Sequence, residues 1–188
     1  MADAMVGRPG RAELVAAQNR TIPDVLPEDG SPPGVLFCGI NPSLYSAATG
    51  HHFARPGNRF WPALHRSGFT GRLLAPHEQG LLPEYGLGIT NLVARATARA
   101  DELTAEELRE GGVRLAALVE RHAPRVLAVA GVTAYRTAFG KRGTVIGAQE
   151  EMFGPARLWV LPNPSGLNAS WTLDRIADEF KRLRAHIS

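Results

Sequence analysis

Two Asn-Pro-Ser sequences, at residues 41–43 and 163–165, are the first candidates for chemistry in this chain. Each follows an apolar run, and turns of this composition can present side chains and free backbone amides to a shared cleft. The side-chain amide of Asn41 is neutral and does not take a proton near pH 7, but its carbonyl oxygen can accept a hydrogen bond from water. Such an amide predicts slow hydrolysis that depends on where the water is held. The competing interpretation is a turn asparagine without a catalytic role.

A carboxylate near the same cleft would add a stronger way to activate water, and Asp101 is the candidate. It is the first carboxylate after Glu84 and lies in the loop beyond the apolar run that contains Asn91. An aspartate there could polarise the attacking water. The alternative is that Asp101 complements the positive end of the helix that starts a few residues later.

Cysteine and histidine usage argues against metal chemistry. Cys38 is the single cysteine, which excludes an intrachain disulfide, a CxxC zinc site and a cysteine-ligated iron–sulfur cluster. It also argues against a zinc-dependent nucleobase deaminase, whose site needs paired cysteines. The six histidines have no spacing typical of metal ligands. We therefore expect no metal and no cofactor, and a buried Cys38 that acts as a small apolar side chain.

Four short apolar runs are the elements that would position these residues. They do not alternate with polar residues, which is typical of strands buried on both faces of a parallel sheet. The runs are residues 35–40, 87–93, 126–131 and 158–161. Ligands bind such sheets beyond the carboxyl ends of the strands, where both Asn-Pro-Ser turns fall.

Amphipathic segments between and after these runs predict helices. One is expected at 58–67 with Asn58 as N-cap, and one from a Thr104–Glu107 capping box to about residue 122. A last helix, around 173–183, has apolar residues at i, i+3, i+4 and i+7, which is typical of core packing. Strands that alternate with helices indicate an α/β domain with a mostly parallel sheet.

Length and composition favour one domain that spans residues 1–188. The longest apolar run, at 126–132, is about seven residues, far short of the ~20 that cross a bilayer. No signal-peptide pattern is visible, so we expect a soluble, cytoplasmic protein that does not contact membranes. Residues 1–20 are expected to be a flexible extension, within which 11–20 could form a short helix.

Charge is distributed unevenly along the chain. The net charge is only +3, but no acidic residue falls between positions 31 and 77, where four arginines do. Acidic residues concentrate instead at 101–110. This pattern is expected of a protein that meets a polyanion on one side, although an ordinary solvated surface would also account for it.

Six segments carry a resemblance that composition cannot show. They read Gly-Ile-Asn-Pro-Ser at 39–43, Gly-His-His-Phe at 50–53, Pro-Gly-Asn-Arg-Phe-Trp at 56–61, Ile-Thr-Asn-Leu-Val at 89–93 with Arg95 and Thr97, Arg-Glu-Gly-Gly at 109–112, and Leu-Pro-Asn-Pro-Ser-Gly-Leu at 161–167. In order and spacing they resemble the mismatch-specific uracil-DNA and thymine-DNA glycosylase family. The resemblance implies a three-layer α/β/α sandwich and a monomeric, cofactor-free enzyme of the nucleoid. Its expected reaction removes uracil from double-stranded DNA and leaves an abasic site.

The resemblance also implies roles for residues near the first motif. Asn41 would position the attacking water, and Gly39, Ile40 and Phe53 would form the base pocket, with Phe53 stacked on the extruded base. Ser46 matches a position near a thymine methyl, where serine leaves less room than alanine and favours uracil. Base extrusion is required because the glycosidic bond is inaccessible inside the stack, and a G·U mismatch lowers the cost of unpairing.

Asn91 and the His51-His52 pair match the thymine-DNA branch, whereas bacterial uracil-specific members tend to have lysine at the position of Asn91. The chain therefore combines features of both branches. The resemblance gives His52 a hydrogen bond to phosphate or to the leaving base; a surface histidine without such a role is the alternative.

The second Asn-Pro-Ser motif resembles the family's intercalating loop. Gly166, Leu167 and Asn168 would enter the duplex, where Leu167 fills the space left by the flipped nucleotide. Asn163 and Ser165 would bind phosphate beside it. The chain departs from the family two residues after the leucine, where Ala169 replaces an arginine. Recognition of the orphaned guanine is therefore expected to be weaker.

Two other classes of function are compatible with parts of the sequence. A catalytically inert mismatch-binding protein would keep the pocket and the wedge, but it would not need the water-positioning Asn41. A small-nucleotide-binding α/β protein would need a phosphate loop such as GxxxxGK[ST], which the sequence lacks. The motifs favour the interpretation as a glycosylase.

Overall fold

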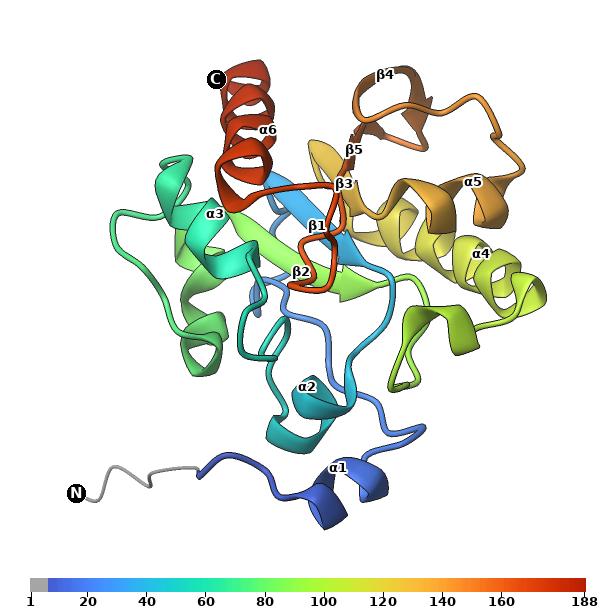
Figure 1. Cartoon of the computed structure of the whole chain (residues 1–188). Coiled ribbons are helices and arrows are strands. Elements are labelled where there is room, and N and C mark those ends of the chain that lie inside the picture. Colours follow the sequence, from blue (N-terminus) through green and yellow to red (C-terminus); the bar gives the residue numbers. More distant parts are fainter. Residues whose placement is uncertain (1–6) are drawn as a thin grey trace.

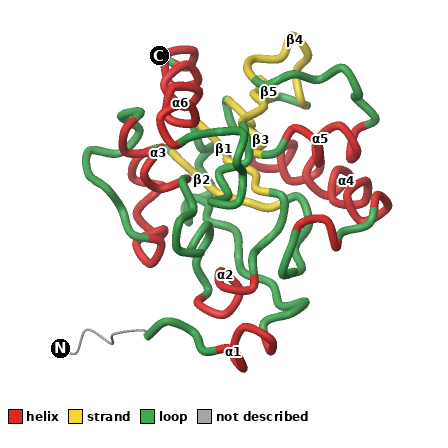
Figure 2. Tube along the Cα trace, in the orientation of Figure 1, coloured by secondary structure: helices red, strands yellow, loops and turns green. Residues whose placement is uncertain are grey.

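The computed structural model describes residues 7–188, which contain one five-stranded sheet flanked by helices (Figures 1 and 2). The strands are β1 (Val35–Gly39), β2 (Leu87–Asn91), β3 (Val126–Ala130), β4 (Gly147–Phe153) and β5 (Ala156–Leu161). Their order is β2-β1-β3-β5-β4, and all neighbours are parallel except β4 and β5. The predicted α/β fold with a mostly parallel sheet is confirmed.

The strands end level with one another at one edge of the sheet. In the register, Gly39 at the end of β1 lies beside Asn91 at the end of β2. Ala130 at the end of β3 likewise lies beside Leu161 at the end of β5. The segments that leave these four strands therefore meet at one edge, as expected for parallel strands.

Helices cover both faces of the sheet and produce the expected three layers (Figure 1). Alternate side chains of a strand point to opposite faces. Phe37 of β1 packs on the side of α3 (Phe60–Arg66) and α6 (Leu173–Ile187). Its neighbours Leu36 and Cys38 pack on the side of α4 (Ala105–His122) and α5 (Val132–Phe139). Burial on both faces explains why these strands lack polar alternation.

The predicted helices form where their caps and apolar stripes place them. At the start of α4, the Thr104 hydroxyl accepts from the Glu107 amide and the Glu107 carboxylate accepts from the Thr104 amide. The stripe of α6 is buried from Ile176 to Leu183. Helix α3 differs slightly, because its N-cap is Arg59 rather than Asn58. The Asn58 side chain still accepts from the first-turn amide of Phe60, at 2.9 Å.

Strand β4 and several short helices were not predicted from the sequence. β4 pairs with only one neighbour, and most of its side chains are exposed, so it carries no apolar run. The short elements are α2 (Leu44–Thr49), η1 (Pro76–Tyr85) and η2 (Ala100–Glu102), which follow β1, precede β2 and precede α4. Two of these three border the functional site.

The N-terminal segment is helical from residue 11 and has its first buried residue at Ala17, although we expected a flexible extension to residue 20. Helix α1 (Arg11–Ala16) is followed by the fully buried Ala17, and the Asn19 amide donates to the carbonyl of Ala96. Val25 then forms an antiparallel bridge with Ile89 of β2. The part of the expected extension at residues 1–6 lies outside the described residues.

Candidate active site

A cavity of about 120 Å³ lies at the carboxyl ends of β1, β2, β3 and β5. The predicted site residues that line it are Gly39, Ile40, Asn41, Ser46, His52, Phe53, Asn91, Asn163, Ser165 and Leu167. Gly166 and Asn168 belong to the adjoining loop, and Asp101 lies outside the lining. The fold thus brings together nearly all of the residues that the two Asn-Pro-Ser motifs and their companions suggested.

The side-chain amide of Asn41 is held in one orientation. Its Nδ2 atom donates to the carbonyl of Arg95 at 3.0 Å and to the hydroxyl of Thr97 at 2.8 Å. That hydroxyl donates its own hydrogen to the carbonyl of Arg99, at 2.7 Å, so it can only accept from Asn41. Both partners therefore require the NH2 group. No group among residues 7–188 donates to the carbonyl oxygen of Asn41, so this oxygen can accept a hydrogen bond from water in the cavity.

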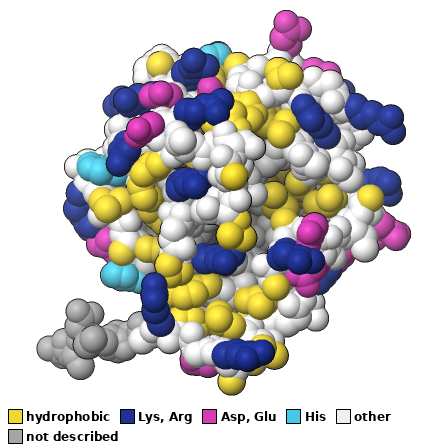
Figure 3. All heavy atoms as spheres, viewed as in Figure 1, with side chains coloured by type: hydrophobic (Ala, Val, Ile, Leu, Met, Phe, Trp, Pro, Cys, Tyr) yellow, Lys and Arg dark blue, Asp and Glu magenta, His cyan; other side chains and the backbone are white. Residues whose placement is uncertain are grey.

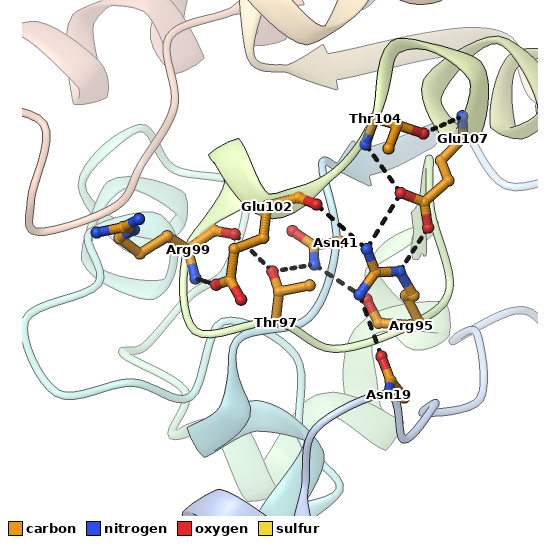
Figure 4. A network of polar contacts seen from close by, with 8 residues as sticks. All are labelled: Asn19, Asn41, Arg95, Thr97, Arg99, Glu102, Thr104 and Glu107. Atoms are coloured by element: carbon orange, nitrogen blue, oxygen red, sulfur yellow. Dashed lines mark hydrogen bonds and ion pairs between the residues drawn. The ribbon is translucent and has the colours of Figure 1, made fainter.

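A polar network stabilises the segment that holds Asn41 (Figure 4). The guanidinium of Arg95 pairs with the Glu107 carboxylate through two contacts, at 2.5 and 3.1 Å, and also donates to Asn19. The Arg95 guanidinium and the Thr104 amide hold the pKa of Glu107 at about 2, well below its usual value. The start of α4 therefore anchors the loop that carries Arg95 and Thr97.

Phe53 forms an aromatic wall of the cavity and has an unusual backbone conformation. Its φ angle is 52°, a region that non-glycine residues seldom adopt. The Ser46 hydroxyl accepts from the next amide, that of Ala54, at 3.1 Å and supports this turn. One face of the Phe53 ring stacks on Phe60, with centroids 4.2 Å apart. The other face remains available to a planar ligand.

Ser46 therefore has a structural role that the sequence did not suggest. Its side chain is 2% exposed, and it also interacts with the hydroxyl of Ser43 at 3.1 Å. Because it lines the cavity as well, its hydroxyl both supports the Phe53 turn and limits the space.

His52 is buried, whereas we expected either a DNA-contacting residue or a surface histidine without a role. The side chain is 1% exposed, its Nε2 atom lies 2.7 Å from the carbonyl of Pro23, and its Nδ1 atom lies 3.3 Å from Nδ2 of Asn91. Burial lowers the pKa of His52, opposed by the Pro23 carbonyl and by Asp24. Because both ring nitrogens already have partners inside the protein, the ring is not placed to bind a phosphate, and it lines the cavity beside Asn91.

Gly39 is required where the cavity floor is tightest. A Cβ atom there would lie 2.7 Å from Oδ1 of Asn91 and 3.2 Å from Cζ of Phe53. The absence of a side chain lets the amide of Asn91 and the ring of Phe53 meet above the end of β1. An amide edge and an aromatic face therefore adjoin at one place.

The loop from 163 to 171 projects Leu167, whose exposed fraction is 67%. Within it, the Asn163 side chain accepts from the Ser165 amide, and the Ser165 hydroxyl accepts from the Leu167 amide. Both side chains thus shape the turn in addition to lining the cavity. The Asn168 side chain donates back to the carbonyl of Asn163 at 3.0 Å. An exposed leucine is held at the tip of a hydrogen-bonded turn.

Arg59 anchors this loop, and its role was not predicted. Its guanidinium donates to the carbonyls of Asn168 at 2.9 Å and Trp171 at 2.5 Å, while its backbone amide donates to the carbonyl of Pro164. Gly57 also approaches the loop closely, because a Cβ on Gly166 would lie 2.7 Å from the Gly57 carbonyl. The sequence signal for Arg59 was its place in the 56–61 motif. Arg95 and Thr97 were likewise marked by their place after the 89–93 motif.

Asp101 does not join the site. It lies in η2, where its side chain is 72% exposed and pairs with Arg99 at 3.1 Å. No residue described as lining the cavity carries a carboxylate, whereas Arg55 and Arg99 both line it. Water in the cavity therefore meets neutral amides and hydroxyls of the described lining, Asn41 among them, and no acidic group.

The surface around the cavity is suited to an anionic ligand. Figure 3 shows this face hollowed near its centre, with several Lys and Arg side chains around the hollow.

Among residues 7–188, no cluster of three or more His, Cys, Asp or Glu side chains could hold a metal ion. In that same part of the chain, no helix is long and apolar enough to cross a membrane. Cys38 is fully buried, and burial raises the pKa of its thiol.

The fold and the cavity define a class of α/β protein with a site at the strand ends, lined by amide and aromatic side chains beside an exposed leucine. The family model of the uracil DNA glycosylase superfamily matches residues 27–186. The chain belongs to this superfamily. It is accordingly a DNA repair glycosylase in general terms, a hydrolase whose substrate is DNA that contains uracil.

Proposed function

We propose that this protein is a mismatch-specific uracil-DNA glycosylase that excises uracil, preferably opposite guanine, from double-stranded DNA without a metal. The observation that carries the proposal is the oriented amide of Asn41, whose NH2 group is fully occupied by Arg95 and Thr97. The arrangement can hold a water molecule without ionising it, which suits cleavage of a bond to a good leaving group.

Base extrusion would bring the target into the cavity. Leu167 is exposed on a loop that Arg59 ties to the start of α3, so it can enter the duplex and fill the vacated space. The extruded uracil would stack on the free face of Phe53 and place its polar edge toward Asn91. Both groups meet above Gly39.

Hydrolysis would then proceed from the oriented amide. The glycosidic bond breaks with the electron pair leaving on uracil, and positive charge develops on the sugar. Water held by the carbonyl oxygen of Asn41 adds to the sugar carbon and afterwards loses its proton to solvent. The gain comes from holding the water in place rather than from a general base. We therefore expect slow single turnovers.

Preference for G·U would arise mainly from the weaker pairing of the mismatch, which lowers the cost of extrusion. Ala169 stands where the family has an arginine, so this chain has no guanidinium there for the orphaned guanine. We accordingly propose that uracil opposite adenine is also cleaved, more slowly. The monomer is the proposed active form.

Single-turnover cleavage of a uracil-containing oligonucleotide, with a chelator present, tests the proposal. The substrates are a G·U duplex, an A·U duplex and the single strand. We expect cleavage that survives the chelator, is fastest for G·U, and falls by about 10²-fold or more in Asn41→Ala. The A·U and single-strand rates measure how far the mismatch controls excision.

Asp101→Asn is the control variant, because Asp101 lies outside the cavity lining. Its rate is expected to equal that of the native protein. Intact binding of G·U duplex without cleavage of any substrate would instead indicate an inert mismatch binder. A rate that Asn41→Ala leaves unchanged would refute the water-positioning role.

A further inference from the structure

The buried ring of His52 has only one arrangement of protons that satisfies both of its neighbours. A backbone carbonyl can only accept, so the nitrogen 2.7 Å from the Pro23 oxygen, Nε2, carries the hydrogen. In the neutral imidazole, Nδ1 is then an acceptor. Its partner, Nδ2 of Asn91 at 3.3 Å, must donate. The tautomer of His52 therefore determines which way the amide of Asn91 faces.

The opposite atom of this amide lies at the cavity floor. Oδ1 of Asn91 lies close to Gly39, as the 2.7 Å distance to a Cβ built there shows. With Nδ2 committed to His52, this oxygen is presented as a hydrogen-bond acceptor beside the Phe53 ring. An acceptor at this place pairs with a base that has an N–H group at its edge.

We propose that His52 is a specificity-determining positioning residue, which makes the site accept uracil and reject cytosine by holding Oδ1 of Asn91 toward the base. The inference rests on the proposed function, because it requires the base edge to meet Asn91. Uracil carries a hydrogen on N3, whereas N3 of cytosine is an acceptor. Oδ1 of Asn91 can accept from N3–H of uracil but faces another acceptor at N3 of cytosine. The carbonyl of Pro23 sets this preference, because it fixes the tautomer of His52 and thereby the orientation of Asn91.

Protonation of His52 at acid pH would reverse the orientation of the Asn91 amide. A protonated His52 donates from both nitrogens, so Asn91 must turn its oxygen toward the ring and its NH2 toward the cavity. The ionisable groups nearest His52 are Asp24, which accepts from the Thr90 hydroxyl, and His51. The remaining contacts of His52 are neutral, namely the side chains of Gln79 and Trp61 on its backbone.

The charge state expected at neutral pH favours uracil. Burial lowers the pKa of His52 more than Asp24 and the Pro23 carbonyl raise it, so the ring is neutral near pH 7. Discrimination against cytosine is therefore expected to be constant near neutrality. It is expected to decline as the pH falls through the lowered pKa of His52.

Two substitutions separate the orienting role from simple packing. His52→Gln can place an NH2 group near the position of Nε2 and keep the bond to Pro23, but it offers no acceptor to Asn91. His52→Asn can place an amide oxygen near the position of Nδ1 and keep the acceptor for Asn91, but it loses the bond to Pro23. Thermal melts of both variants identify any that fails to fold.

The measurement is the ratio of single-turnover rates for 5-fluorouracil and 5-fluorocytosine, each opposite guanine, because fluorine makes both bases better leaving groups. We expect His52→Gln to lower this ratio by about tenfold. His52→Asn is expected to keep it within about threefold. Native protein should lose discrimination at acid pH, and this acid limb should vanish in His52→Gln. Equal ratios for both variants and the native protein would overturn the inference.

A spectroscopic readout keeps this inference distinct from the proposed function. Long-range ¹H–¹⁵N spectra of the native protein should show His52 with its hydrogen on Nε2 and a bare, acceptor Nδ1 near neutral pH. A hydrogen on Nδ1 would overturn the inference even if uracil is excised. Absence of uracil excision in the native protein would refute the proposed function, and the role assigned to His52 would fall with it.

Discussion

Thr97 illustrates how one hydroxyl can define the chemistry of a neighbouring amide. It accepts from Asn41 because its own proton is committed to the carbonyl of Arg99. Without that second bond, the hydroxyl could donate instead, and the carbonyl of Arg95 alone would require the NH2 edge of Asn41. The carbonyl of Arg99 therefore helps to orient the amide of Asn41 through the hydroxyl of Thr97.

Thr97→Val tests this dependence, since valine has nearly the same shape and no hydroxyl. We expect single-turnover excision of uracil to fall by about 10²-fold, because the amide of Asn41 loses one of the two bonds that orient it. Affinity for the G·U duplex should change little. Thr97→Ser, which keeps the hydroxyl, is the matched control. Equal rates in both variants would contradict the orienting role.

Ser46→Ala should have two separable effects. Loss of the bond to the Ala54 amide is expected to reduce the free energy of unfolding by about 1 kcal/mol. The smaller side chain should also raise excision of thymine relative to uracil, because it leaves more room in the cavity. Chemical denaturation measures the first effect, and single-turnover rates on G·T and G·U duplexes measure the second. A lower stability with an unchanged ratio would limit Ser46 to its structural role.

At the scale of elements, the start of α3 and the loop before α6 form one unit. The guanidinium of Arg59 donates to three carbonyls of that loop, and the 2.7 Å approach at Gly166 shows how closely Gly57 adjoins it. Loops of this length are usually mobile, which would make insertion into a duplex costly in entropy. Anchoring reduces that cost because Leu167 is already held in position.

Arg59→Lys and Leu167→Ala are each expected to weaken binding of the G·U duplex by about tenfold. A lysine has a single charged nitrogen and cannot span the carbonyls that the guanidinium bridges. Fluorescence anisotropy with an uncleavable duplex measures the affinity. Arg66→Lys is the control, because Arg66 ends the helix that Arg59 caps and, among the described residues, pairs with the exposed Asp174. Both substitutions keep the positive charge, so similar losses in Arg59→Lys and Arg66→Lys would contradict the anchoring role of the Arg59 guanidinium.

At the scale of the whole molecule, two carboxylates couple the fold to acid pH. Arg72 and the Ala75 amide hold the pKa of Glu78 at about 2, as Arg95 and the Thr104 amide do for Glu107. Their usual value is 4.5, so both are ionised in the folded protein under conditions that protonate them when it unfolds. Their contribution to stability is fully present above about pH 4.5 and is lost as the pH falls toward 2.

Acid denaturation followed by circular dichroism should therefore show stability that declines between about pH 4.5 and pH 2. Glu107→Gln is expected to flatten this decline and to lower stability at neutral pH, since the glutamine cannot pair as an anion with Arg95. Because Glu107 also holds the segment that orients Asn41, the variant should excise uracil more slowly. Glu150→Gln, in the exposed edge strand β4, is the control and should leave the decline unchanged. An identical decline in Glu107→Gln and the native protein would contradict the assignment.

The sequence by itself determined the central strands, the main helices and the residue types of the site. Apolar runs predicted β1, β2, β3 and β5, because strands buried on both faces need apolar side chains in succession. The capping box predicted α4, since its hydrogen bonds are local. The edge strand β4 was missed because only one neighbour and little burial constrain its residues. Motif resemblance placed Asn41, Phe53 and Leu167, all of which line the cavity.

Only the tertiary structure decided what those residues can do. The bond that orients Asn41 joins residues 56 apart, and the bond that anchors the wedge loop joins residues 109 apart. Packing also moved His52 from the expected surface to the interior and left Asp101 in solvent. Local patterns reflect burial and turns, whereas the direction of an amide or the burial of a ring depends on which distant groups the fold brings against it.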